Sequence, residues 1–257
     1  MGSVIQTNVA SLGAQKSLFK TNNELSTTFN RLSSGFRINS AKDDASGLVI
    51  SNQLSSEIGG YQVALRNAND GISFAQVAEG ALQEVTNILL RMRDLSLQAS
   101  SGQVPAAGVT AIEAEFTALN SEITRITGNT TFGGSTVFGA TINVVVEADG
   151  GSVAVAVGTV TAPGGTAANG PAGLDTAIAA VDTLRGNLGA SQSRLTSAAN
   201  NLLAGIENSS AARSRIRDTD FASESANLAK LQVLQQASFS VLAQANASSQ
   251  SVLSLLQ

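Results

Sequence analysis

A long, unbroken stripe of apolar residues at helical spacing limits the possible folds of this chain more than any other feature. The steps of three and four positions predict one continuous helix from about Ala45 to Ala99. At about 1.5 Å per residue this helix is roughly 80 Å long, which is too long for an ordinary compact domain. Gly102 and Pro105 end it, and a shorter helix is expected at about Val109–Thr127. The stripe consists of Leu54, Ile58, Tyr61, Leu65, Ala68, Ile72, Ala75, Leu82 and Leu89.

A heptad register follows in the second half of the chain. Its positions are Leu174, Ile178, Val181, Arg185, Leu188, Gln192, Leu195, Ala199, Leu202, Ile206, Ser209, Arg213 and Ile216. Steps of four and three without a slip are typical of a helix that packs lengthwise on another helix. Several of these core positions are polar.

The segment between the two helical patterns changes to a period of two. Ile142, Val144 and Val146 alternate with other residues before Asp149, and three valines alternate after Gly150. This pattern predicts a small β-hairpin within about 132–162. The stretch from Thr161 to Gly173 is rich in glycine and proline and is expected to be a linker.

Both ends of the chain carry further apolar stripes. The first, from Asn8 to Leu32, contains Val9, Leu12, Phe19, Leu25, Phe29 and Leu32. The second contains Leu228, Leu231, Leu234, Val241, Leu242, Val252 and Leu255. Residues 231–257 hold no charge, but six Gln and six Ser make them unsuitable for a membrane span. We therefore expect a mainly α fold with long helices and a small β-hairpin.

The composition excludes most enzymatic chemistry. The chain has no His and no Cys, which rules out Ser-His and Cys-His nucleophile pairs, imidazole or thiolate zinc sites and disulfides. We expect no catalytic, cofactor-binding or metal-binding residues, and hence no enzyme. Fifteen basic residues against nineteen acidic ones give a net charge of -4, which disfavours a nucleic-acid partner. The first ten residues lack the basic and apolar regions of a cleaved signal peptide, so secretion would proceed without one.

The segment RLSSGFRINSAKDDASG, from Arg31 to Gly47, is dense in charge and hydroxyl groups. Adjacent carboxylates at a helix start point about 100° apart, so Asp43 and Asp44 are not arranged for catalysis. Capping a helix is their expected role. The segment is interpreted as a joint between two helices, carried by Arg31, Gly35, Arg37, Lys42, Asp43 and Asp44.

Residues 66–85 include Asn67, Asn69, Asp70 and Gly71, which weaken a helix. A calcium-binding loop would need more acids at alternate positions and a terminal Glu. A close backbone approach against a neighbouring helix is the favoured explanation.

Several motifs together resemble those of bacterial flagellins and cover most of the chain. They lie at Asn8–Gln15, Arg31–Leu54, Leu65–Leu82, Arg91–Ser100, Val181–Leu195, Ala212–Ala237 and the terminal SVLSLLQ. The resemblance implies a subunit that is exported unfolded and assembles itself into the helical tube of the swimming flagellum, outside the cell. It implies long antiparallel helices and a terminal coiled coil, with an inner coiled-coil domain of residues 1–40 and 220–257, an outer core domain of 41–219 and no outer variable domains. The two terminal stripes would form subunit interfaces, and the joint would be the spoke between the domains.

The resemblance also implies partners. Besides further copies of itself, these are the flagellar export apparatus, an export chaperone, the filament cap and the hook-junction proteins, with no nucleic acid and no membrane. The Toll-like receptor for flagellin recognises a patch that matches Arg91, Leu95, Gln98, Glu115, Leu174 and Ile178 here. Leu90 departs from the Gln often found in that patch.

Three alternatives are weighed. A hook-filament junction protein shares the helical ends but is not expected to keep both long motifs this fully. A flagellin with a protease insert would need the usual zinc motif, which a chain without His cannot form. A coiled-coil adaptor would stay a small oligomer.

Overall fold

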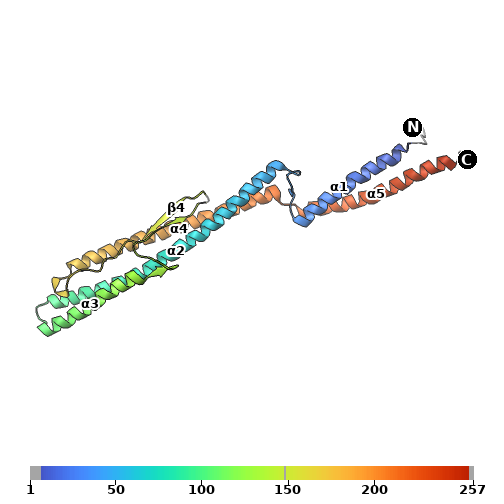
Figure 1. The fold of residues 1–257 in the computed structure, drawn as a ribbon. Coiled ribbons are helices and arrows are strands. Elements are labelled where there is room, and N and C mark those ends of the chain that lie inside the picture. Colours follow the sequence, from blue (N-terminus) through green and yellow to red (C-terminus); the bar gives the residue numbers. More distant parts are fainter. Residues whose placement is uncertain (1–6, 148, 255–257) are drawn as a thin grey trace. The chain divides into compact units, whose positions relative to one another are not determined.

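A computed structural model describes residues 7–147 and 149–254 and confirms the mainly α fold. The helices are α1 (Val9–Ser34), α2 (Ala45–Ser100), α3 (Ala106–Asn129), α4 (Ala172–Arg217) and α5 (Phe221–Ser254), and a short 3-10 helix, η1, covers Ala167–Asn169. The strands are β1 (Thr131–Phe132), β2 (Ser135–Thr136), β3 (Thr141–Val145) and β4 (Ser152–Ala156) (Figure 1).

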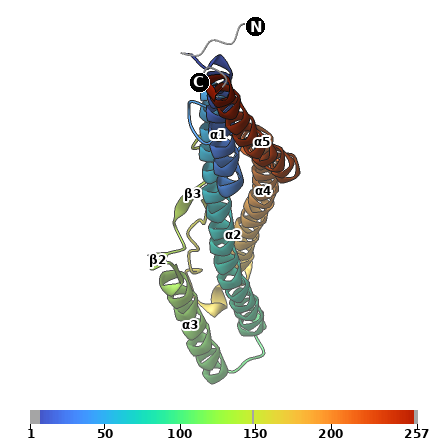
Figure 2. The same ribbon diagram turned by 90° about the vertical axis from the view of Figure 1, so that its right-hand side faces the viewer.

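The residues group into two compact units, described separately here. The terminal unit comes from Met1–Ser56 and Ser209–Gln257, and the central unit is Glu57–Asn208. Helices α2 and α4 each begin in one unit and end in the other. Within the terminal unit, α1 and α5 lie side by side (Figures 1 and 2).

The central unit has a continuous apolar core. Helix α3 folds back beside α2 (Figure 1). The hairpin of β3 and β4 contributes its inward side chains to the same core. Its largest fully buried side chains are Leu82, Leu89, Met92, Leu95, Ile123, Leu188 and Leu195. The heptad predicted for α4 is confirmed, since Leu174, Val181, Leu188 and Leu195 are all buried at seven-residue intervals.

Two polar residues at core positions of that heptad share a partner on α2. The Gln192 side chain donates a hydrogen bond to the Glu79 carboxylate at 3.1 Å, and Arg185 lies 3.9 Å from the other oxygen of the same group. The bond pairs the Gln192 amide at the margin of the core, whereas the buried Nε of Arg185 has no hydrogen-bond partner among the described residues.

The predicted hairpin is present. Ile142 pairs with Val155 and Val144 pairs with Val153, and the chain reverses between them at Glu147–Gly151. A second, smaller hairpin of β1 and β2 was not predicted from the sequence. It turns at Gly133 and Gly134, whose φ angles of 59° and 85° are those favoured by glycine in a tight hairpin turn.

The segment expected to be a linker is fixed in part to the helices. The Glu113 carboxylate on α3 accepts hydrogen bonds from the backbone amides of Ala167 and Ala168, at 3.0 and 3.1 Å. The buried Ser96 hydroxyl on α2 donates to the carbonyl of Ala167 at 2.7 Å. Side chains from two helices therefore hold η1 in place, which composition alone did not indicate.

Gly71 is closely approached, but its nearest neighbours are side chains of the hairpin and of α4 and not the backbone of a neighbouring helix. A Cβ at this position would lie 2.6 Å from a methyl of Val144 on β3 and 3.1 Å from a methyl of Leu195 on α4. The glycine in α2 therefore lets the hairpin and α4 approach the helix closely.

Candidate functional site

The antiparallel pair of α1 and α5 is the candidate site, because its two faces differ sharply. Between the helices, α1 buries Ser11, Ala14, Thr21 and Thr28. Leu18, Leu25 and Leu32 are half-buried at the intervening heptad positions. From α5, the same seam contains Glu224, Leu228, Leu231, Gln235, Ser238, Leu242 and Ala245, with Leu231 and Ala245 fully buried. Small and hydroxyl-bearing residues thus form much of the contact between the two helices.

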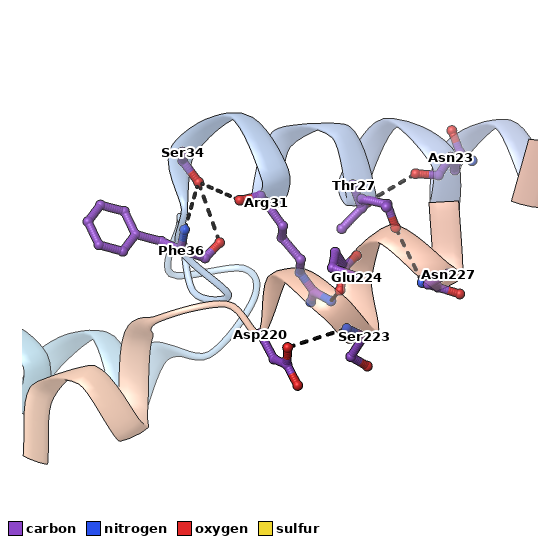
Figure 3. A network of polar contacts seen from close by, with 10 residues as sticks. Asn23, Thr27, Arg31, Ser34, Phe36, Asp220, Ser223, Glu224 and Asn227 are labelled. Atoms are coloured by element: carbon purple, nitrogen blue, oxygen red, sulfur yellow. Dashed lines mark hydrogen bonds and ion pairs between the residues drawn. The ribbon is translucent and has the colours of Figure 1, made fainter. Parts of the chain in front are cut away.

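Side-chain hydrogen bonds fix the register of this pair. Asn8 donates to the carbonyl of Ala245 at 2.9 Å, which ties the start of α1 to the C-terminal half of α5. Gln235 donates to the Asn22 side chain at 2.7 Å. Asn227 donates to the Thr28 hydroxyl at 3.4 Å, near the other end of the pair (Figure 3).

Large apolar side chains are displayed away from the seam. Phe19 is 70% exposed and Val9 is 69% exposed. The exposed set of the pair consists of Val9, Leu12, Phe19, Phe29, Phe221, Val233, Leu234, Phe239 and Val241. Exposed apolar residues in this number on one helix pair mark an interaction surface.

The residues predicted as an interface divide between these two faces. Leu25, Leu32, Leu228, Leu231 and Leu242 lie in the seam within the chain. Val9, Leu12, Phe19, Phe29, Leu234 and Val241 are exposed. Val252 belongs to α5, but its side chain, like the whole of Leu255, lies outside the described residues.

Sequence reasoning did not single out Leu18, Phe221, Val233 and Phe239. Leu18 could have been found from its seven-residue spacing to Leu25 and Leu32.

In the joint, the backbone of residues 35–37 pairs with the backbone of residues 217–219. Gly35 ends α1 with φ 74°, a left-handed conformation suited to glycine, and its carbonyl accepts from the Thr219 amide at 3.0 Å. The Arg37 amide donates to the carbonyl of Arg217 at 2.7 Å, and Phe36 forms an isolated bridge with Asp218. The Arg37 guanidinium donates to the Ile216 carbonyl.

An arginine from each helical end supports this pairing. The Arg217 guanidinium stacks 4.1 Å from the centre of the Phe36 ring. On the α1 side, Arg31 lies 3.9 Å from the Glu224 carboxylate of α5 (Figure 3).

The two predicted acids cap local structure. Asp44 accepts a hydrogen bond from the amide of Gly47 at 2.9 Å, which caps the start of α2. Asp43 accepts from the amides of Asn39 and Ser40, and these bonds hold the pKa of its carboxyl below the ordinary value. Lys42, between the joint and α2, is exposed.

The positions of the proposed receptor patch are split between surface and core. Arg91 on α2 binds Glu115 on α3 through two hydrogen bonds of 2.9 and 2.7 Å, and both side chains are exposed. Gln98 is also exposed and Ile178 is half-buried. Leu95 and Leu174 are buried in the core, so in this structure they support the patch from beneath and do not form its surface.

Within the described residues, no group of three or more acidic side chains is placed to hold a metal ion. In the same part of the chain, none of the helices has an apolar stretch sufficient to cross a lipid bilayer.

Comparison with known proteins gives matches at both ends of the chain. Residues 5–142 match the bacterial flagellin N-terminal helical region, and residues 172–256 match the bacterial flagellin C-terminal helical region. Flagellin D of Vibrio anguillarum is 36% identical over 373 aligned positions, which cover 98% of this chain and 99% of the relative. Flagellin D of Vibrio cholerae is 35% identical, with the same coverage.

Two further matches cover part of the chain. B-type flagellin of Pseudomonas aeruginosa is 55% identical over 134 residues, which are 52% of this chain and 28% of that protein. The crystal structure of Bacillus cereus flagellin matches with a TM-score of 0.42 and 26% identity, over 63% of this chain and 94% of that one. The two family matches and the full-length relatives together show that the chain belongs to the bacterial flagellin family, the structural and non-enzymatic subunits of the flagellar filament.

Proposed function

We propose that this filament subunit polymerises through the helix pair of α1 and α5, and that neighbouring copies cover the apolar side chains the pair leaves exposed. The observation that carries the proposal is the exposed set led by Phe19 and Val9. Burial of apolar surface is the main driving force of stable association. A seam of small and polar residues contributes less of it than a leucine seam would.

The pair of α1 and α5 leaves large apolar side chains exposed and has a seam of small and polar residues, which supports folding coupled to assembly. The terminal helices bury little apolar surface against each other, so we expect them to be disordered in the free monomer. Stacking on neighbouring subunits would supply the missing burial and order the helices. This behaviour suits a chain that is exported unfolded, and the absence of Cys suits passage as an unfolded chain.

We also propose a division into an inner domain and an outer core domain that are connected by the joint. The inner domain would comprise residues 1–40 and 220–257 and the outer core domain 41–219. The spoke between them would use Arg31, Gly35, Arg37, Lys42, Asp43 and Asp44, and the paired backbones of Gly35–Arg37 and Arg217–Thr219 support that role. The Vibrio anguillarum alignment spans more positions than this chain has residues, which supports the absence of outer variable domains.

The uncharged stretch of α5 after Lys230 is proposed to line the bore of the tube. Fixed charges would retain a passing unfolded chain through ion pairing, whereas neutral Gln and Ser side chains would not. The export apparatus, an export chaperone, the filament cap and the hook-junction proteins are proposed as further partners.

Truncation tests the assembly proposal directly. A chain lacking residues 231–257 should not elongate filament seeds, because the α5 half of the pair is removed. Electron microscopy and sedimentation measure the polymer, and circular dichroism checks that the central unit remains helical. Filaments from the truncated chain would contradict the proposal, and a full-length chain that stays a small oligomer would favour an adaptor.

A host Toll-like receptor is a second proposed partner, through the exposed Arg91, Gln98 and Glu115. Leu95 and Leu174 would hold the helices that carry this patch, with Ile178 at its margin. A receptor reporter assay with soluble monomer tests this proposal, and Arg91→Glu should reduce the response. Absence of any response to the unaltered monomer would rule out the receptor.

A further inference from the structure

We propose that α1 and α5 form a socket that receives a bulky apolar side chain of a second copy of this chain. The socket is the groove lined by Gly13 and Ser17 on α1 and by Leu234, Ala237 and Val241 on α5. The inference rests on the proposed polymerisation through this helix pair and assigns the position where a neighbouring copy inserts.

Apolar side chains form the exposed edge of the groove, and small side chains form its base. It encloses about 360 Å³, and the buried Ala14 and half-buried Ser238 close it toward the seam. Leu234 and Val241 stand at its α5 edge, 43% and 57% exposed. Small side chains on both helices leave the space between these two aliphatic residues open. A knob of apolar atoms placed there would remove both from water.

Gly13 has no role within the chain that would require a glycine. Three other helical glycines have such a role, since an added Cβ would meet Ile38 at Gly47, Val144 at Gly71 and Tyr61 at Gly205, whereas Gly59, Gly80, Gly186 and Gly189 are as open as Gly13. A Cβ on Gly13 would meet no described atom within 4 Å, and its φ is not positive. Glycine in the middle of a helix is destabilising by about 1 kcal/mol relative to alanine. Gly13 lines the groove between α1 and α5, and the absence of a side chain there leaves the groove open to a group from outside the chain.

A second copy is the occupant that fits the lining. The α5 wall carries no charge, since the last charged residue of the chain is Lys230, so an ionic ligand has no counter-charge there. The same unit presents Phe19, Phe29 and Phe239 with about half or more of each side chain exposed. In a homopolymer each neighbouring copy supplies such side chains. In coiled coils, an apolar knob inserts into a hole formed by residues of the facing helix.

Filling the socket tests the inference. Gly13→Leu places a large side chain in the groove and raises the helix propensity of α1, so the variant should fold at least as well as the parent. Seeded elongation, followed by light scattering, should show a critical concentration raised by about tenfold or more. The matched control is Gly80→Leu, an exposed helical glycine on α2 whose added Cβ also meets no described atom within 4 Å.

The outcomes separate the socket from the wider proposal. A Gly13→Leu chain that elongates like the parent overturns the socket while polymerisation through the pair stands. Equal losses in Gly13→Leu and Gly80→Leu also overturn it, because the effect is then not specific to the groove. If the unaltered chain fails to elongate seeds, the polymerisation proposal itself fails.

Alkylation of an introduced cysteine measures whether the groove is covered, without filling it. The chain has no cysteine, so Ser17→Cys introduces a single thiol at the α1 edge of the groove. Its rate of alkylation by a maleimide should fall by about tenfold or more when monomer becomes filament, because the inserted side chain covers the thiol. The same rate in monomer and filament overturns the socket.

Discussion

The terminal helix pair and the central unit contrast in what they bury. The central unit encloses leucines, valines and Met92 in one continuous core. Among its described side chains, the terminal pair fully buries Ser11, Thr21 and Thr28 together with Ala14, Leu231 and Ala245, while Phe19 and Val9 remain exposed. The central unit is therefore equipped to fold by itself, whereas the terminal pair needs surface from other molecules. The difference assigns stability to one region and assembly to the other.

The sharpest way to break this contrast is to remove a core leucine. Leu195→Ala should lower the free energy of unfolding by about 2–5 kcal/mol, because Leu195 is fully buried against α2 and the hairpin. Urea denaturation followed by circular dichroism measures the loss. The control, Leu203→Ala on the same helix, removes a half-exposed side chain and should change stability by no more than about 0.5 kcal/mol. Similar losses in both variants would contradict the assigned core.

A pair of glycine variants sharpens the contrast between close packing and open space. Gly71→Ala should destabilise the central unit, since the new methyl overlaps Val144. Gly80→Ala should stabilise it through helix propensity, because the position is open. Their thermal or urea unfolding free energies should differ by about 2 kcal/mol, with Gly80→Ala the more stable. The reverse order would show that the hairpin does not pack on Gly71.

Phe19→Ala tests the role of the exposed apolar face of the terminal pair. Loss of an exposed ring should change the unfolding free energy of the monomer by less than about 0.5 kcal/mol. Its critical concentration for polymerisation should nevertheless rise by about tenfold, because the ring would be buried only between subunits. Calorimetry of the monomer and sedimentation of the polymer measure the two quantities. A destabilised monomer with normal assembly would contradict the division of roles.

The smallest expected effect concerns acid sensitivity at the joint. The amides of Asn39 and Ser40 favour the ionised Asp43, so its folded pKa lies below the unfolded value of about 3.9. Its contribution to stability is fully present above the unfolded pKa and is lost as the pH falls through the folded pKa. Asp43→Asn should remove this part of the acid dependence in unfolding measured between pH 2 and 5, and parallel curves for variant and parent would contradict it.

The sequence predicted those parts of the molecule that depend on periodic apolar residues. The long helix, the α4 heptad and the β3–β4 hairpin repeat over many residues, so each was identifiable. The glycine at position 71 was also interpretable, because it interrupts an otherwise regular helix.

Other features depended on partners that no local pattern reveals. The α1 side of the seam could not be identified from apolar spacing, because three of its buried residues, Ser11, Thr21 and Thr28, bear hydroxyl groups. The fixed position of η1 depends on Glu113, more than fifty residues earlier in the chain. The joint capping by Asp44 was predictable from its place before α2, but the bridge of Phe36 to Asp218 joins residues far apart in sequence.

The exposed apolar face of α1 and α5 also has a thermal consequence for the polymer. Because the exposed aromatic and aliphatic side chains would leave water only on assembly, the heat capacity change of polymerisation should be large and negative. The enthalpy of subunit addition should then vary steeply with temperature, and the hydrophobic part of the attraction should weaken on cooling. A filament held together in this way loses subunits in the cold before the central units themselves begin to unfold.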